Sequence, residues 1–203
     1  MDIATKCSPA HTALIVIDIQ RDFAAPDGLL ARRGRDISAV DPMVDRLQTT
    51  TAIAKQAGVP VLYAKQIYDR TKLTPLQLEQ YDCDGKMVTC DINTNGHEFY
   101  RINPDSKTVF PKYNYNVFSN PDFCAFLDKN GIKTLVITGM DTCYCVETAI
   151  RNGFDLGYKI VVPEDLVLGS SKHQEIQDRT LWLVRKTYGV VTLSEELNRL
   201  WGQ

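Results

Sequence analysis

The sequence predicts an α/β fold with a parallel sheet that is covered by helices on both faces. Short apolar runs rich in β-branched residues alternate along the chain with segments of helical length. The run at residues 12–17 is apolar almost without interruption, which is typical of a strand buried on both faces. The chain has 203 residues, enough for a full hydrophobic core, and we expect one domain spanning 1–203.

Local signals place the elements in order. The first strand ends at Asp18, and the next helix opens at Ser38 or Asp41, carries an apolar stripe at helical spacing and stops at Gly58. Further strands are expected at 59–64, 108–110, 134–138, 159–162 and 190–192. Further helices are expected at 119–131, from the 139–142 turn to about 157, at 172–187 and from 194 onwards.

Two of these helices have distinct start signals. Asn120 followed by Pro121 combines a capping residue with a proline in the first turn. The segment 194–197 reads SEEL, which is expected to cap a short terminal helix. The long polar segment 66–107 has no clear periodicity, so we expect a binding loop or short elements that the pattern hides.

Composition excludes several classes of function. Lys and Arg number 23 against 25 Asp and Glu, a net charge of −2, so the chain lacks the basic surface expected for nucleic acid or anionic membrane. No apolar run is long enough to span a bilayer, and the first residues do not resemble a signal peptide. We therefore expect a cytoplasmic protein whose six cysteines are reduced thiols.

Three reactive side chains follow predicted strands, where ligands bind in open α/β sheets. Asp18 follows the first strand, Lys112 the third, and Cys145 lies in the first turn of the helix after the fourth. A helix N-terminus favours the thiolate form of a cysteine, and a nearby lysine adds to this effect. Each residue also has a structural alternative: a small buried cysteine, a turn-capping aspartate and a solvated lysine.

Three blocks of the sequence resemble the isochorismatase-like cysteine hydrolase family. Residues 13–23 read ALIVIDIQRDF, like the opening strand of the family with its Asp and the Gln and Asp-Phe that follow. Residues 111–118 are similar to Pro-Lys-x-x-Tyr-Ser-Ala-Phe, and residues 139–146 to Gly-Val-x-Thr-Asp-x-Cys-Val. The blocks occur in the family's order and span most of the chain.

The resemblance implies a three-layer αβα sandwich with a six-stranded, mainly parallel sheet. It also implies an amidohydrolase in which Asp18, Lys112 and Cys145 form a catalytic triad. Cys145 would attack the carbonyl carbon of a small amide or carbamoyl compound, cleave its C–N bond and form a thioester acyl-enzyme. Backbone N–H groups of Asp141 and Cys145 would bind the oxyanion, and the Met140–Asp141 peptide would be cis.

Departures from the family pattern bear on substrate and cofactor. Cys143 stands where the family has Asp, and Asn116 stands where it has Ser. Nicotinamidases of the family carry an Asp-x-His…His metal set after the second strand, whereas residues 65–70 read KQIYDR, so we expect no metal and no other cofactor. The aromatic residues near the three blocks, together with the start of the polar segment, predict a substrate pocket that includes Phe23, Gln66, Tyr115 and Tyr144.

Other interpretations stay open at this point. A non-catalytic or thiol-redox protein on the same scaffold would use Cys143 and Cys145 as a redox pair. A four-thiolate zinc site that adds Cys83 and Cys90 fits no standard spacing. The resemblance also implies a homo-oligomer, a dimer or tetramer, and the apolar residues near the C-terminus would pack either on a neighbour or on their own chain: Leu197, Leu200 and Trp201.

Overall fold

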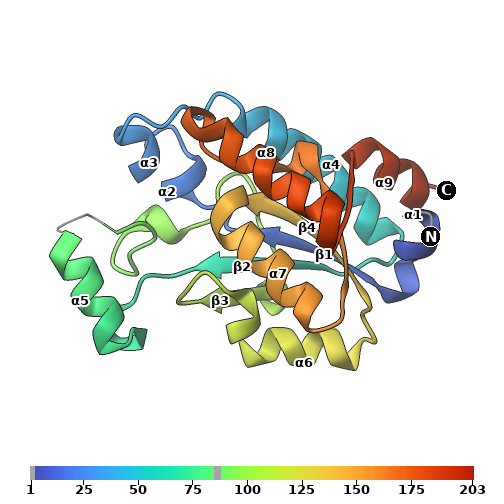
Figure 1. Cartoon of the computed structure of the whole chain (residues 1–203), viewed down its shortest axis with the longest axis horizontal. Helices are drawn as coiled ribbons and strands as arrows, with labels where there is room; N and C mark the ends of the chain where they lie inside the picture. The colour runs from blue at the N-terminus through green and yellow to red at the C-terminus, as the bar shows by residue number, and fades with distance from the viewer. Residues whose placement is uncertain (1–2, 85–87) are drawn as a thin grey trace.

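A computed structural model describes residues 3–84 and 88–203 of the chain, with seven strands in one sheet (Figure 1). The main order is β3-β2-β1-β4-β5-β7, β6 pairs with β4, and every strand pair is parallel. The strands are β1 (Thr12–Ile17), β2 (Val61–Gln66), β3 (Val109–Lys112), β4 (Thr134–Met140), β5 (Lys159–Pro163), β6 (Val167–Leu168) and β7 (Gly189–Thr192).

Helices cover both faces of the sheet, which gives the predicted three layers. Helices α6 and α7 lie on one side and α4 and α9 on the other (Figure 1). The helices are α1 (Ile3–Lys6), α2 (Arg21–Ala24), α3 (Leu29–Arg32), α4 (Val40–Gln56), α5 (Pro75–Asp84), α6 (Pro121–Lys129), α7 (Glu147–Asp155), α8 (Gln174–Leu183) and α9 (Ser194–Trp201).

Strand β1 shows why the apolar run forms the centre of the sheet. All six of its residues are buried. Because successive side chains of a strand point to opposite faces, Ile15 and Ile17 join the core under α6 and α7, and Leu14 and Val16 join the core under α4 and α9. A strand with helices on both sides has no solvated face, so it needs no alternating polar residues.

The C-terminal residues complete the core of their own chain. Leu197 and Trp201 are buried against the α4 side of the sheet, and the Trp201 indole donates a hydrogen bond to the Cys7 carbonyl at 2.9 Å. The start of α9 differs from the predicted cap. Leu193 is the N-cap residue, and Ser194 instead donates its backbone N–H and its hydroxyl to the Asp165 carboxylate.

The six predicted strands are present, with shifted ends and one addition. Strand β2 begins at Val61 rather than at residue 59, because Pro60 has no N–H to donate to the ladder. The seventh strand, β6, has only two residues, too few for any sequence period to indicate. Within the polar segment, helix α5 is one of the short elements that the pattern hid.

The strand order changes direction between β1 and β4. From β1 the chain first builds outward through β2 and β3, and then returns to place β4 on the other side of β1. Such a switch point opens a crevice beyond the carboxyl ends of the strands. Helices α3 and α5 lie beyond that end of the sheet, on the left in Figure 1, so the segments that carry them wall the crevice.

Candidate active site

The three strand-end residues meet at the switch point. Lys112 Nζ lies 2.8 Å from Asp18 Oδ2 and donates to Cys145 Sγ at 3.2 Å. Asp18 directly follows β1, Lys112 is the last residue of β3, and Cys145 lies in the π-helical turn after β4. The fold therefore joins residues that are 94 and 33 positions apart in the chain, counted as 112 − 18 and 145 − 112.

Lys112 is buried and its ammonium group contacts other residues of the site, so it is not the solvated surface lysine of the alternative interpretation. Its residue is 1% exposed, and Nζ also donates to Gln66 Oε1 at 2.7 Å and to the Asn114 carbonyl at 3.2 Å. Burial opposes the ammonium form, but the neighbouring Asp18 and Cys145 outweigh burial and raise the pKa of Lys112 above its usual value. The site thus holds a permanent positive charge next to the sulfur.

The helix N-terminus and Lys112 do not bring the pKa of the Cys145 thiol below its usual value, contrary to the expectation from sequence. Burial raises this pKa most, the Asp18 carboxylate raises it further, and Lys112 only partly opposes both. The physical reason is that a thiolate would be a second buried anion beside Asp18, whose ion pair is with Lys112.

The end of β2 and Gln20 hold the Asp18 carboxylate. The backbone N–H of Gln66 donates to Asp18 Oδ1 at 3.1 Å and to Gln20 Oε1 at 2.8 Å. The Gln20 amide in turn donates to the carbonyls of Gln66 and His97, both at 2.8 Å. Within the described part of the chain, Asp18 Oδ2 accepts no hydrogen bond of regular geometry and has the ion pair with Lys112.

The Asp22 carboxylate ties two loops around the crevice. Its Oδ1 accepts from the backbone N–H of Leu29 at 3.1 Å, and its Oδ2 accepts from that of Cys90 at 2.7 Å. A Cβ at Gly96 would lie 2.1 Å from Asp22 Oδ2, so this close approach requires glycine. The Gln and Asp of the first motif thus hold the walls of the site through their hydrogen bonds.

The turn that carries Cys145 begins with a close backbone contact. Gly139 has φ of +111°, and a Cβ there would lie 2.0 Å from the Ile17 carbonyl oxygen of neighbouring β1. The Met140–Asp141 peptide that follows is cis. The Asp141 carbonyl accepts from the N–H groups of Tyr144 at 3.0 Å and Val146 at 3.2 Å.

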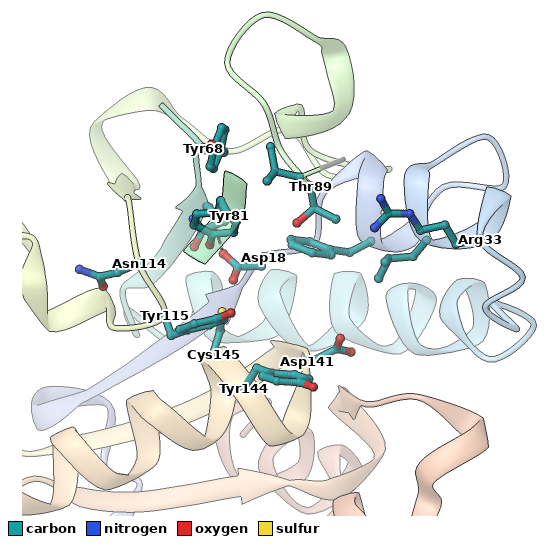
Figure 2. A pocket seen from close by; sticks show the side chains of 14 residues that line it. Asp18, Arg33, Tyr68, Tyr81, Thr89, Asn114, Tyr115, Asp141, Tyr144 and Cys145 are labelled. Atoms are coloured by element: carbon teal, nitrogen blue, oxygen red, sulfur yellow. Dashed lines mark hydrogen bonds between the residues drawn. The ribbon is translucent and has the colours of Figure 1, made fainter. Parts of the chain in front are cut away.

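A cavity of about 270 Å³ lies over these residues (Figure 2). Figure 2 shows Tyr68 and Tyr81 on one side of Asp18, and Tyr115, Tyr144 and Cys145 on the other. The rings of Tyr115 and Tyr144 are stacked with centroids 6.1 Å apart. All four predicted pocket residues line the cavity, together with residues that sequence reasoning missed: Leu30, Arg33, Tyr68, Tyr81, Val88, Thr89, Asn114 and Asp141 as a side chain.

The missed lining residues had no chemical signal in the sequence. Tyr81 comes from α5, in the segment without periodicity, and Leu30 comes from the short helix α3. A further contact that the sequence does not indicate joins Arg35 to Asp141: Nη1 donates to Oδ2 at 2.7 Å, and Nη2 contacts Oδ1. A contact across 106 positions leaves no mark in local sequence.

The alternative cysteine and metal sites have less support. Cys7, Cys90, Cys124, Cys143 and Cys145 are free thiols, and the Cys83 side chain lies outside the described residues. Burial raises the pKa of the half-buried Cys143, which does not favour a reactive redox thiol. Across 3–84 and 88–203, no three side chains among His, Cys, Asp and Glu come together in a way that could hold a metal ion.

Among the described residues, no helix combines the length and the apolar character that a bilayer crossing needs.

The fold and the site define an open α/β protein with a buried aspartate, lysine and cysteine at its switch point. The Isochorismatase domain model matches residues 12–196, so the chain belongs to the isochorismatase family. Its sequence is 32% identical over 174 residues to ureidoacrylate amidohydrolase RutB of Pantoea ananatis, which covers 78% of this chain and 69% of that protein. It is 31% identical over 189 residues to the RutB of Methylobacterium radiotolerans, and the match covers 82% of this chain and 68% of that protein.

Solved structures support the same fold. A cysteine hydrolase from Pseudomonas syringae pv. phaseolicola has a TM-score of 0.82 at 24% identity, over 96% of this chain and 93% of that one. N-carbamoylsarcosine amidase from Thermoplasma acidophilum has a TM-score of 0.71 at 22% sequence identity, over 91% of this chain and 97% of that one. At these identities the likeness shows the fold alone. The chain is thus a member of a hydrolase family whose named sequence relatives act on carbon–nitrogen bonds other than peptide bonds.

Proposed function

We propose that this protein is a cysteine-dependent amidohydrolase that cleaves a C–N bond of a small amide or carbamoyl compound through a thioester acyl-enzyme. One observation carries the proposal: Lys112 Nζ lies 2.8 Å from Asp18 and 3.2 Å from Cys145, with all three side chains buried beneath a small cavity. A buried carboxylate, ammonium and thiol in mutual contact are costly to assemble, which favours a chemical role over a packing role.

The reaction begins with transfer of the thiol proton. Asp18 Oδ2 takes the proton of Cys145 as the sulfur attacks the substrate carbonyl carbon, so no free thiolate accumulates beforehand. The tetrahedral intermediate then breaks its C–N bond, and Asp18 gives the proton to the leaving nitrogen. Ammonia or an amine departs. Water, activated by Asp18, next attacks the thioester; the acid is released and Cys145 regains its proton.

Charge on the sulfur and the oxygen is balanced by fixed groups. Lys112 stabilises the sulfur while it carries negative charge and keeps Asp18 oriented through their 2.8 Å ion pair. The N–H groups of Asp141 and Cys145 receive the developing oxyanion. The Asp141 carbonyl accepts from the N–H groups of Tyr144 and Val146, and the Cys145 N–H lies between these two in the same turn, next to the thiol.

The cavity favours a small, planar compound. At about 270 Å³ it lies near the lower end of ligand sites, and the stacked rings of Tyr115 and Tyr144, with Phe23 nearby, present flat apolar surface. Ureido and carbamoyl groups are planar and match this shape. The relatives named above act on ureidoacrylate and N-carbamoylsarcosine, so these two compounds, with nicotinamide as a cyclic aromatic amide, form the test panel.

The experiment measures ammonia release from the panel by the wild-type chain, Cys145→Ala and Cys143→Ala, each with and without a chelator. We expect Cys145→Ala to keep the fold and to lose turnover by at least about a thousandfold, because nucleophile removal leaves only binding and oxyanion contacts. Cys143→Ala is the matched control and retains turnover, since the mechanism needs no second thiol. Wild-type rates in Cys145→Ala contradict the mechanism, and dependence on Cys143 supports the thiol-redox alternative.

We further propose that the enzyme needs no metal or other cofactor, so chelation leaves ammonia release unchanged.

We also propose that the protein forms a homo-oligomer, a dimer or tetramer, and is located in the cytoplasm. The exposed Trp182 on α8 and Leu193 before α9 supply apolar surface suited to contact between copies. Light scattering of the purified chain distinguishes these assemblies from a monomer of 22.9 kDa.

A further inference from the structure

A buried ion pair joins Arg35 to Asp141 at the edge of the candidate site. Nη1 of Arg35 donates to Asp141 Oδ2 at 2.7 Å, Nη2 contacts Oδ1, and the two side chains are 10% and 15% exposed. Two-point contact between a guanidinium and a carboxylate fixes the direction of both groups. Burial opposes the charge of Arg35, but Asp141 outweighs burial and raises the pKa of this guanidinium. The guanidinium therefore stays charged.

The pair connects two walls of the cavity. Arg35 follows helix α3 and Gly34, and its backbone N–H bonds the Leu30 carbonyl at 3.0 Å, which anchors it to the wall that carries Leu30. Asp141 begins the turn that carries Cys145, and its own side chain lines the cavity. The guanidinium thus holds the turn from outside, at the residue whose N–H is one of the two proposed oxyanion donors.

We infer that Arg35 is a positioning residue for the amide cleavage proposed above, on which this inference rests. By fixing the Asp141 side chain, it keeps the Asp141 peptide N–H directed into the site, where a donor acts only within about 2.7–3.1 Å of the oxyanion. It also neutralises a carboxylate that lines the cavity. An unpaired charge at Asp141 would repel the negative oxygen of the tetrahedral intermediate, whereas it would affect a neutral ground-state substrate much less.

The consequence is an effect on kcat rather than on KM. Removing one oxyanion donor lowers kcat by about 10²–10³, and misplacing a donor that remains present should cost less. We therefore expect Arg35→Met to lower kcat for the panel compound that the wild type hydrolyses fastest by roughly 10–100-fold, with KM changed less than about threefold. Arg35→Lys, which keeps the charge and loses the two-point contact, should recover part of the loss.

Three further measurements separate positioning from a structural role. Alkylation of Cys145 by iodoacetamide forms no oxyanion, so its rate should fall much less in Arg35→Met than kcat does. Arg21→Met is the matched control. Arg21 on α2 forms an exposed ion pair at 2.5 Å with Asp27, which lies in the loop between α2 and α3. The kcat of Arg21→Met should stay at the wild-type value. Since Arg35 acts through Asp141, the double variant Arg35→Met/Asp141→Asn should lose no more than Arg35→Met alone.

The outcomes are distinct. The positioning role is overturned by any of three results: a wild-type kcat in Arg35→Met, additive losses in the double variant, or equal losses in kcat and in the alkylation rate. If the wild type is active, each of these results leaves the proposed function in place. No ammonia release from ureidoacrylate, N-carbamoylsarcosine or nicotinamide by the wild type contradicts the proposed function itself, and the inference with it.

Discussion

Replacing Lys112 by methionine tests the physics of the site without any substrate. The Lys112 and Asp18 side chains are 0% and 1% exposed, and their charged atoms lie 2.8 Å apart. Methionine fills most of the lysine volume but removes the charge, so Lys112→Met leaves the Asp18 carboxylate buried without its partner. The Gln66 side-chain oxygen, now 2.7 Å from Nζ, loses its donor as well. We expect a large loss of stability.

The magnitude follows from the burial of the pair. Breaking a buried ion pair by removing one partner costs about 3–5 kcal/mol. For a chain of this size each kcal/mol shifts Tm by about 2–4 °C, so Lys112→Met should lower Tm by roughly 6–20 °C. Urea unfolding followed by circular dichroism measures the free energy directly. The control is Arg199→Met, which breaks the 3.2 Å pair with Glu195, 70% and 80% exposed; it should cost less than about 1 kcal/mol.

The double variant Lys112→Met/Asp18→Asn decides the cause. If the cost comes from an uncompensated carboxylate, removing that charge too should recover at least half of the lost free energy of unfolding. A loss in Lys112→Met no larger than in Arg199→Met would refute this reasoning. So would a double variant whose loss equals the sum of the single losses, because it would show that the two charges do not interact.

Two further predictions concern the thiol and the turn. Because burial and Asp18 raise the pKa of Cys145, its labelling by iodoacetamide should keep accelerating as pH rises past 8.5, after subtraction of the Cys145→Ala background; a plateau near pH 6–7 would mean a stable thiolate instead. Gly139→Ala should destabilise the fold far more than Gly131→Ala: both have positive φ, of +111° and +61°, but only at Gly139 would the Cβ meet a backbone oxygen, at 2.0 Å. Equal urea midpoints for the two variants would disprove the crowding.

Most of the fold follows from sequence patterns because the signals are local. The run at 12–17 needs only its own residues to indicate a strand buried on both faces, and it forms β1 with those bounds. Strand β2 begins at Val61 and not at the predicted residue 59, because Pro60 has no N–H to donate to a neighbouring strand. Strand β6 and helices α2 and α3 have four residues or fewer and form because the rest of the fold supports them. Segments this short show no hydrophobic periodicity in the sequence, so they were not predicted.

The candidate site was predictable in its residues and less so in its chemistry. Asp18, Lys112 and Cys145 were selected because each follows a strand and lies in a motif that resembles the family. The protonation of the thiol was predicted with the wrong sign, because a helix N-terminus is visible in sequence and the depth of burial is not. Arg35 was missed for a similar reason: its partner Asp141 lies 106 positions away.

The amino-acid order alone therefore predicted most strands and helices and the three side chains proposed as catalytic, since each of these predictions depends on neighbours within a few residues or on a short motif. The distances among those side chains, the direction of their pKa shifts and the ion pair that holds the turn depend on the folded chain. They depend on it because Coulomb attraction and desolvation vary with separation and burial in space, and the strand order, not position along the chain, sets both.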